Sequence, residues 1–327
     1  SKTPFKRITF KESMLKYGTD KPDLRIPIEI SDVTNIFKSD EIKLEIFKKQ
    51  INKNSIVRAI PVKNTKEKSR SFFDNFNEWA KSEGAGGLAY ISLEKSNNSF
   101  KASGPIAKFF SKKALNELTK KCKITDGDSL FFICDRQEIA EKISGLTRQK
   151  VAKELKLIDE NVFEFCWITD FPLYKYDEDL KKIDFSHNPF SMPNIKYEDF
   201  DKEDPLNIIA KQYDLICNGI EISSGAIRNH ILKLMYKVFS KVGYSKEDVD
   251  KKFSGMIKAL SYGAPPHGGM APGIDRIVML LANEENIRQI TLFPLTQNAQ
   301  DLLMGAPLDV SDEQLRDLNL RILKKIK

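Results

Sequence analysis

The sequence predicts an α+β protein with more than one domain. Short apolar runs with the two-residue period of β-strands alternate with lysine-rich amphipathic stretches that have the period of helices. The chain has 327 residues, of which 41% are hydrophobic and 30% are charged, so it can bury more than one core. We find no internal repeat and no low-complexity segment beyond a bias toward lysine.

A compact α+β unit is expected in the first half of the chain, after a turn at YGTDKPDLR, residues 17–25. Its strands are predicted in EISDVTNIF, IVRAIPV, GGLAYISL and SLFFICD. Its helices are predicted in SFFDNFNEWAKSEG, KKALNELTKKC and GLTRQKVAKELKL.

The second half is expected to contribute three strands that lie far apart in the sequence, FEFCWITDFPLY, YDLICNGIEISS and ITLFPL. Between them, LKLMYKVFSKVG and YSKEDVDKKFSGMIKALSYG have the clearest helical patterns. A further helix is predicted to begin at Pro272 and Gly273. Its buried face is expected to consist of Ile274, Ile277, Val278 and Leu281.

Composition argues against a membrane, secreted or zinc-binding protein. No apolar run approaches the roughly 20 residues of a membrane-spanning helix, and SKTPFKRITF lacks the apolar segment of a secretory signal, so we expect a cytoplasmic protein. The scattered cysteines favour reduced, buried thiols; they are Cys122, Cys134, Cys166 and Cys217. Residues 1–150 hold 30 Lys and Arg against 19 Asp and Glu, which favours a nucleic-acid partner only weakly, since lysine-rich composition explains it equally well.

Two carboxylates in YDLICNGIEISS are candidates for a metal site. Strand alternation puts Asp214 on one face of a single regular strand and Glu221 on the other. Only a bend or bulge near Gly219 would bring both carboxylates to one site. The spacing alone therefore leaves open that Glu221 is a solvated strand end.

Arg228 and His187 are candidates for recognition of a substrate. Ser223, Ser224 and Gly225 are predicted to form a turn that opens the helix of HILKLMYKVF. Arg228 follows that turn, where its forked donors suit a planar carboxylate, although a surface ion pair is the alternative. His187 lies in the proline-rich loop FSHNPFSMP, and such a histidine is either structural, solvated or catalytic.

Arg276 stands inside the otherwise apolar stretch GGMAPGIDRIVMLL. We expect this arginine to be desolvated, because apolar residues occupy the other faces of the predicted helix. A desolvated arginine needs an anionic partner, which is either an internal carboxylate or a bound phosphate.

Together these stretches resemble the bacterial-type aspartyl-tRNA synthetases, a family of class II aminoacyl-tRNA synthetases. The shared motifs, in order, are YGTDKPDLR, GGLAYISL with GPIAKFF, WITDFPLY, HNPFSMP, YDLICNGIEISSGAIRNH, and GAPPHGGMAPGIDR followed by FPLTQNAQDLLMGAP. The resemblance implies a partial class II catalytic domain, an antiparallel sheet flanked by helices, in residues 1–26 and 161–327. It also implies an inserted α+β domain in residues 27–160, like one in an amidotransferase subunit.

The resemblance assigns a role to each candidate in the first part of the site. Asp214 and Glu221 would hold Mg²⁺, and Glu221 would also bind ATP as a catalytic residue. Arg228 would read the side chain of the substrate L-aspartate, and His187 would close over the aspartate and the adenylate.

Motif 3 would complete the site. Gly273 and Arg276 would bind ATP, with Arg276 as a catalytic residue on the γ-phosphate. The implied reaction activates aspartate with ATP and transfers it to tRNA-Asp, or also to tRNA-Asn.

The chain departs from the family pattern in two ways. Ser223 and Ser224 precede Gly225 where many relatives have a run of glycines. The anticodon-binding domain, the homodimer-forming motif 1 and the phosphate-gripping motif 2 do not occur in the sequence, so we expect a truncated piece with little or no adenylation activity alone. The alternative is a non-catalytic paralogue that binds RNA or a protein partner; a ligase for another amino acid is disfavoured by Arg228 and by the insertion.

Overall fold

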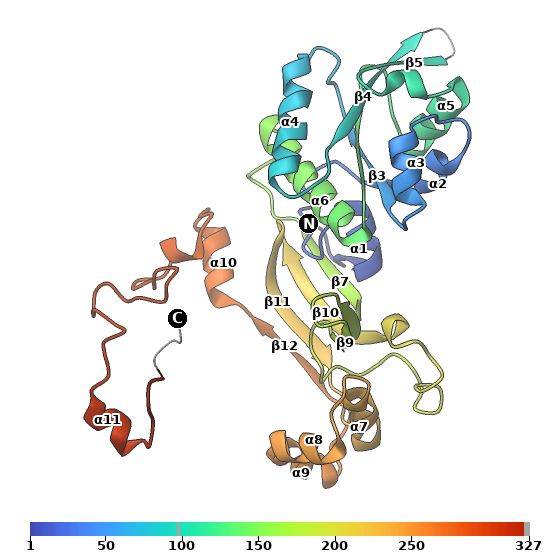
Figure 1. The fold of residues 1–327 in the computed structure, drawn as a ribbon. Helices are drawn as coiled ribbons and strands as arrows, with labels where there is room; N and C mark the ends of the chain where they lie inside the picture. The colour runs from blue at the N-terminus through green and yellow to red at the C-terminus, as the bar shows by residue number, and fades with distance from the viewer. Residues whose placement is uncertain (97–98, 324–327) are drawn as a thin grey trace. The chain divides into compact units, whose positions relative to one another are not determined.

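A computed structural model of the chain describes residues 1–96 and 99–323. The chain divides into two compact units, Ser1–Pro272 and Gly273–Lys327. The first unit contains two five-stranded sheets flanked by helices, which confirms the predicted α+β class (Figure 1). Among the described residues, no helix combines the length and the apolar character that crossing a bilayer requires.

Sheet A, with the order β1-β7-β10-β11-β12, joins residues from both ends of the first unit. Its strands are β1 (Lys6–Thr9), β7 (Phe165–Pro172), β10 (Ile209–Cys217), β11 (Ile220–Ile227) and β12 (Gly268–Pro272). β1 runs parallel to β7, and the other neighbouring strands are antiparallel. Helix α1 (Phe10–Tyr17) packs on β7, and the apolar cluster beneath it includes Ile168 and Ile216.

Sheet B, with the order β2-β3-β6-β4-β5, is formed by the chain between α1 and β7. Its strands are β2 (Ser31–Asp32), β3 (Ile56–Val62), β4 (Ala89–Ser96), β5 (Ser99–Ser103) and β6 (Ser129–Asp135). SLFFICD was predicted as a strand and coincides with β6. The predicted strand EISDVTNIF is mostly wrong, because Asp32 accepts the Thr34 amide at 2.9 Å and a helix follows.

Helices cover both faces of sheet B (Figure 1). One face packs against α4 (Arg70–Ser82) and α6 (Gln137–Glu154). The other face packs against α2 (Thr34–Lys38), α3 (Glu45–Ile51) and α5 (Lys112–Lys121). The short 3₁₀ helix η1 (Ala107–Phe109) lies beside β5. This arrangement follows from strand alternation, since Phe131 belongs to the first apolar cluster and Phe132 to the second.

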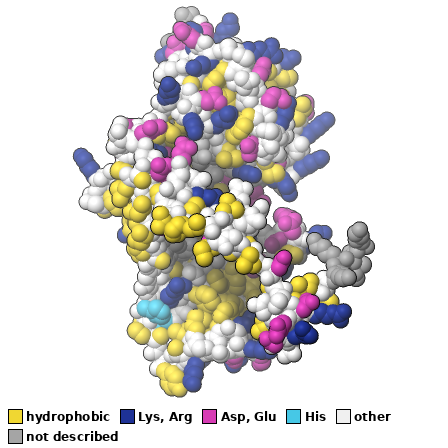
Figure 2. All heavy atoms as spheres, turned by 90° about the vertical axis from the view of Figure 1, so that its left-hand side faces the viewer, with side chains coloured by type: hydrophobic (Ala, Val, Ile, Leu, Met, Phe, Trp, Pro, Cys, Tyr) yellow, Lys and Arg dark blue, Asp and Glu magenta, His cyan; other side chains and the backbone are white. Residues whose placement is uncertain are grey.

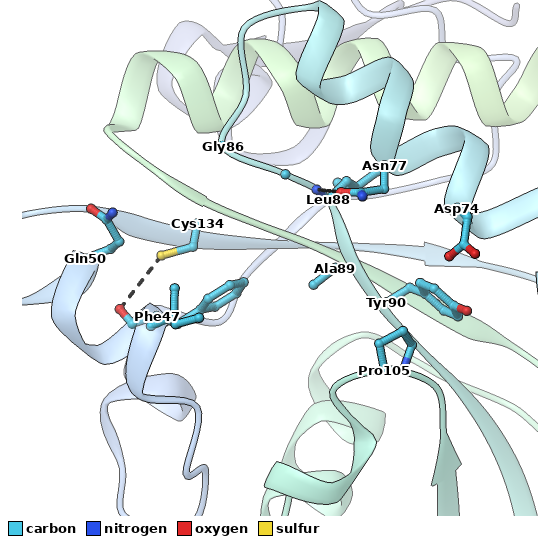
Figure 3. Close-up of a pocket in the computed structure, with 12 residues that line it drawn as sticks. Phe47, Gln50, Asp74, Asn77, Gly86, Leu88, Ala89, Tyr90, Pro105 and Cys134 are labelled. Atoms are coloured by element: carbon cyan, nitrogen blue, oxygen red, sulfur yellow. Dashed lines mark hydrogen bonds between the residues drawn. The ribbon is translucent and has the colours of Figure 1, made fainter.

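A cavity of about 280 Å³ opens where β4 begins, next to α3 and α4. β4 pairs with β6 only from Ala89 opposite Phe132, so β6 continues past the start of its neighbour. Asn77 accepts the Leu88 amide at 2.8 Å on the rim of the cavity (Figure 3). No described residue of its wall has a buried polar atom that lacks a partner, so the wall gives no indication of a ligand.

A helical cluster lies beyond the end of β11. It contains α7 (Leu232–Ser240), α8 (Lys246–Lys252) and α9 (Ser254–Ser261), which pack with Tyr174 and Phe200. The second helical pattern predicted here is therefore confirmed as two helices. The hairpin of β8 (Tyr174–Asp177) and β9 (Lys182–Phe185) and the 3₁₀ helix η2 (Pro205–Asn207) complete this part.

The second unit contains α10 (Ile274–Leu281), the 3₁₀ helix η3 (Ile287–Gln289) and α11 (Asp312–Asp317). Gly273 is the N-cap of α10, which confirms the predicted helix start. The predicted buried face is wrong, because Ile274 and Leu281 are 66% and 73% exposed and only Met279 is buried. The strand predicted in ITLFPL is also wrong, since no neighbouring strand in the described residues pairs with it.

We predict that Gly225→Ala destabilises sheet A. A Cβ at this position would lie 2.4 Å from the Gly269 carbonyl oxygen and 2.5 Å from Cε2 of Tyr213. Overpacking of this kind costs about 1–3 kcal/mol of unfolding free energy, which urea denaturation measures. Gly269→Ala on the paired strand is the matched control, because a Cβ there meets nothing within 4 Å. Equal unfolding midpoints for the two variants would contradict the prediction.

Candidate functional site

The strands β10 and β11 form a hairpin, so the prediction of one continuous strand through YDLICNGIEISS is wrong. The chain turns at Asn218 and Gly219, whose φ angles are 52° and 82°. Two successive positive φ angles are typical of the tight turns that join paired strands. The Asn218 side chain also accepts the Glu164 amide at 2.8 Å and donates to the Val162 carbonyl at 3.0 Å, which fixes the turn against the start of β7.

The hairpin contains a β-bulge at Ile222. Leu215 pairs with Ser223, but Ile216 pairs with Glu221, so β11 has one more residue than β10 between these two pairs. An extra residue of this kind reverses the alternation of side chains that follow it.

The hairpin turn brings Asp214 and Glu221 to the same face of sheet A. Residues directly opposite each other share a face, so Glu221 lies on the face of Ile216. Asp214 lies two residues from Ile216 and therefore on that face as well. The bend near Gly219 that the sequence left open is this hairpin turn. The bulge at Ile222 comes after Glu221 and instead places Ser224 on the same face, opposite Asp214.

Asp214 is buried and incompletely bonded. Its side chain is 4% exposed, and no described residue donates a hydrogen bond to its Oδ1 atom. Burial raises the pKa of Asp214 above its ordinary value, and the charge of Glu221 adds to this shift, whereas Ser224 and Gln212 oppose it. A carboxylate in this condition is stabilised by any cation that reaches its open oxygen.

Lys21 brings a cation to these carboxylates. Its Nζ atom lies 3.6 Å from Oε2 of Glu221 and 2.6 Å from Oδ2 of Asp20. Lys21 also lowers the pKa of Asp214 through its charge. Reasoning from residue patterns treated YGTDKPDLR only as a turn; its two adjacent charges were the signal that could have marked it as part of the site.

His187 lies at the edge of the same cluster. Its ring packs edge-on against Phe10 and Phe171, with centroids 5.8 Å and 4.9 Å away. Part of the side chain reaches solvent, yet the packing around the ring lowers the pKa of His187 by desolvation, and the charge of Asp20 opposes this. The imidazole is therefore neutral at neutral pH and can both donate and accept hydrogen bonds.

Arg228 lies toward the other end of β11 from Glu221. The predicted turn at residues 223–225 is wrong, because these residues form the middle of β11 between two paired strands. Arg228 follows that strand, with an exposed side chain and an amide that donates to the His267 carbonyl at 2.9 Å. It forms a β-bridge with Ser191, so the HNPFSMP loop that carries His187 reaches Arg228.

Several buried polar atoms in this region lack partners among the described residues. Besides the Asp214 carboxylate, they belong to Ser191, Gln212, Ser223 and Asn229. Buried polar groups are normally hydrogen-bonded, so their concentration here is typical of a binding region rather than of a packed core.

The carboxylates fit a Mg²⁺ ion that is shared with a phosphate ligand. No group of three or more His, Cys, Asp and Glu side chains in the described part of the chain could enclose a metal ion. Mg²⁺, however, is usually held by one or two carboxylates together with substrate phosphates and water. Asp214 and Glu221 provide such a pair, with one open buried oxygen.

Gly273 and Arg276 belong to the second compact unit. Arg276 lies in the first turn of α10, two positions after the helix begins. Its side chain is exposed, so the expectation of a desolvated arginine is wrong for this structure. The reason is the exposure of the apolar neighbours Ile274 and Val278, which do not enclose it.

Comparisons with known proteins place the chain among synthetases. Residues 1–297 match the family described as tRNA synthetases class II (D, K and N). The aspartate–tRNA(Asp/Asn) ligase of Pelagibacter ubique is 61% identical over 322 residues, which cover 98% of this chain and 54% of the relative.

Ligases with the same name show similar coverage. The ligase of Rickettsia felis is 54% identical, and the match covers 100% of this chain and 54% of the relative. The ligase of Wolbachia pipientis is 53% identical, and the match covers 98% of this chain and 53% of the relative. The chain thus spans about half the length of the curated relatives it matches.

We predict that Lys21→Met strengthens the binding of Mn²⁺, a probe for divalent cations. The ammonium of Lys21 competes for the Glu221 carboxylate, and a partly exposed ion pair contributes about 0.4–1 kcal/mol, so affinity should rise about two- to five-fold. Water-proton relaxation titrations measure this affinity. Lys182→Met on β9 is the control, and an equal or weaker affinity in Lys21→Met would refute the competition.

We also predict that Asp214→Asn stabilises the folded protein at pH 7. The folded-state pKa of Asp214 is raised, so the folded protein binds more protons than the unfolded chain between the two pKa values. Stability therefore falls as pH rises through that window, and the wild-type chain carries the full cost at neutral pH.

Urea unfolding at pH 7 and near pH 4 checks the effect of Asp214→Asn. The gain in unfolding free energy should shrink as the pH approaches the unfolded-state pKa of aspartate. Asp179→Asn, in the exposed turn between β8 and β9, gives the baseline for removing one negative charge. A gain that grows on acidification would show that the carboxylate is stabilised by folding.

Proposed function

We propose, since this chain belongs to the class II tRNA synthetases (D, K and N), that it carries part of the catalytic site of an aspartate–tRNA ligase. The observation that supports this most is the hairpin turn at Asn218 and Gly219, which puts Asp214 and Glu221 on one face beside Lys21. The names of the relatives support aspartate as the amino acid. They do not favour the alternative of a non-catalytic paralogue.

The residues of sheet A would bind the phosphates of ATP through a shared cation. Asp214 and Glu221 would hold Mg²⁺, which when bound neutralises charge on phosphate oxygens. Lys21 would add a second cation that the segment before β2 already holds in place. In the second unit, Gly273 and Arg276 would bind ATP, with Arg276 on the γ-phosphate.

Arg228 and His187 would recognise the amino acid. The planar guanidinium of Arg228 can donate two parallel hydrogen bonds to the side-chain carboxylate of aspartate. The neutral ring of His187 can donate a hydrogen bond to aspartate or to the adenylate without adding a charge.

The proposed reaction has two steps. An oxygen of the aspartate α-carboxylate attacks the α-phosphorus of ATP, and the bond to pyrophosphate breaks. A terminal ribose hydroxyl of the tRNA then attacks the activated carbonyl carbon, and AMP leaves. The side chains of the site contribute by aligning the reacting groups and by stabilising negative charge on the phosphates.

The proposed partners are ATP, L-aspartate and tRNA-Asp, with tRNA-Asn as a second acceptor. We propose further that residues 27–160 form an insertion in a catalytic domain, and that the ligase is a cytoplasmic homodimer. Dark-blue Lys and Arg side chains are scattered over the upper part of the face in Figure 2, where sheet B lies, among magenta Asp and Glu side chains. The excess of Lys and Arg over Asp and Glu in residues 1–150 suits a polyanion.

Binding of a non-hydrolysable aspartyl-adenylate analogue to this chain tests the proposal. Arg228→Lys should weaken binding of the analogue about tenfold or more, because a bidentate charged pair is lost, while binding of AMP should stay unchanged. Isothermal titration calorimetry measures both affinities. Arg136→Lys, outside the site, is the control for an arginine-to-lysine change.

Two results would contradict the proposal. One is failure of the unsubstituted chain to bind the analogue. The other is an equal loss of affinity for AMP and for the analogue in Arg228→Lys, which would remove the aspartate-reading role. ATP-pyrophosphate exchange with and without Glu221→Gln then shows whether bound aspartate is activated.

A further inference from the structure

Arg148 on helix α6 is fully buried, yet it bonds only to main-chain oxygen atoms. Its Nε donates to the Ile28 carbonyl at 2.7 Å, and its Nη2 donates to the carbonyls of Asp23 and Ile26 at 2.8 Å and 2.9 Å. The guanidinium carbon lies 4.9 Å from the centroid of the Tyr17 ring. One side chain thus supplies the donors that a paired strand would otherwise supply to this irregular stretch.

The charge of Arg148 has no carboxylate partner among the described residues. The Asp23 carboxylate on the same segment pairs instead with Arg25 at 2.8 Å. Burial lowers the pKa of Arg148 to about 10, so the side chain still carries its charge at neutral pH. An apolar side chain would avoid the cost of burying a cation, but it would leave three carbonyl groups without donors.

The bonded stretch belongs to the segment 18–30, which joins α1 to β2. Its residues Ile26, Ile28 and Ile30 are buried in the apolar cluster between sheet B and α6. At its start the segment touches α6 directly, because a Cβ on Gly145 would lie 2.6 Å from the Gly18 oxygen. The segment is therefore fixed to α6 by main-chain contact at one end and by Arg148 in the middle.

The same segment carries the cation of the proposed site. Lys21 lies two residues before the Asp23 carbonyl that Arg148 holds, and its Nζ atom is 3.6 Å from Oε2 of Glu221. The segment also crosses the β10–β11 turn, where a Cβ on Gly219 would be 3.3 Å from Cβ of Asp23. A shift of the segment would therefore move Lys21 away from Glu221.

We propose that Arg148 is a positioning residue for this site: from helix α6 it fixes the segment 18–30 and so holds Lys21 against Glu221. The inference rests on the proposed function only in what it says the site binds. The helix that covers sheet B thereby determines the charge balance at carboxylates on sheet A.

Chemical labelling of Lys21 in the whole chain tests the proposal without any ligand. In Arg148→Met, acetylation of Lys21 by acetic anhydride should become several-fold faster relative to Lys182, as mass spectrometry measures. Arg148→Lys keeps the charge and some donors, so it should restore part of the protection. Leu118→Ala, buried on the opposite face of sheet B, weakens the same unit and should leave the ratio unchanged.

Binding of Mn²⁺ provides a second readout, at a temperature where circular dichroism shows every variant folded. Arg148→Met should raise the affinity by the same factor as Lys21→Met, and the double variant should show no further gain, because both changes remove one interaction. Unchanged labelling of Lys21 with a lower unfolding midpoint in Arg148→Met would overturn the proposal, as would additive effects in the double variant.

The two proposals can fail separately. Mn²⁺ binding that is indifferent to Asp214→Asn would remove the proposed metal site, and the labelling ratio would still decide the role of Arg148. If Mn²⁺ binding depends on Asp214 but Lys21 stays protected from labelling in Arg148→Met, only the positioning role of Arg148 is removed.

Discussion

The register between β10 and β11 is the constraint on which the site depends. Ile216 is fully buried beneath α1, so β10 cannot slip by one residue without exposing its apolar face. With β10 fixed, the two-residue turn at Asn218 and Gly219 decides that Glu221 lies opposite Ile216, on the face of Asp214. The two carboxylates are therefore brought together by this turn and by the core packing of Ile216, which lies between them in the sequence.

Electrostatics at the site is a balance that the fold maintains at some cost. Two carboxylates share one face, and one of them is almost completely buried. Lys21 offsets part of their negative charge, but only because an irregular segment is held in place by a buried arginine. Burial of the Asp214 carboxylate and of the Arg148 guanidinium, each away from the other, lowers the stability of the fold. Desolvated charges of this kind are typical of sites that bind charged ligands.

Alternating and amphipathic patterns predicted most elements because burial on one side leaves a periodic signal. β6 is the clearest case, since SLFFICD coincides with the strand. The hairpin turn was missed although Asn218-Gly219 is a strong turn signal, because the flanking residues read equally well as one strand. Gly225 was misread as a turn; it is a glycine because the Gly269 carbonyl oxygen and the side chains of Tyr213 and Met270 leave no room for a Cβ.

Other features leave no local signal at all. Arg148 occurs in a lysine-rich helix where an arginine normally faces solvent, and only the tertiary fold shows that it is buried. ITLFPL has the composition of a strand but pairs with no strand in the described residues. The roles of Asp214 and Glu221 came from family resemblance, because their spacing separates them until the hairpin turn is known.

The turn that closes the hairpin also affects the chemical stability of the protein. An asparagine followed by glycine deamidates readily when the glycine amide nitrogen can attack the side-chain carbonyl carbon and expel ammonia. Water then opens the cyclic imide to aspartate or isoaspartate; both carry a new negative charge, and isoaspartate adds a methylene to the main chain. In this fold both polar atoms of the Asn218 side chain are engaged by Val162 and Glu164. Those two hydrogen bonds hold the reactive group in place, so folding protects from chemical decay the very turn that sets the position of Glu221.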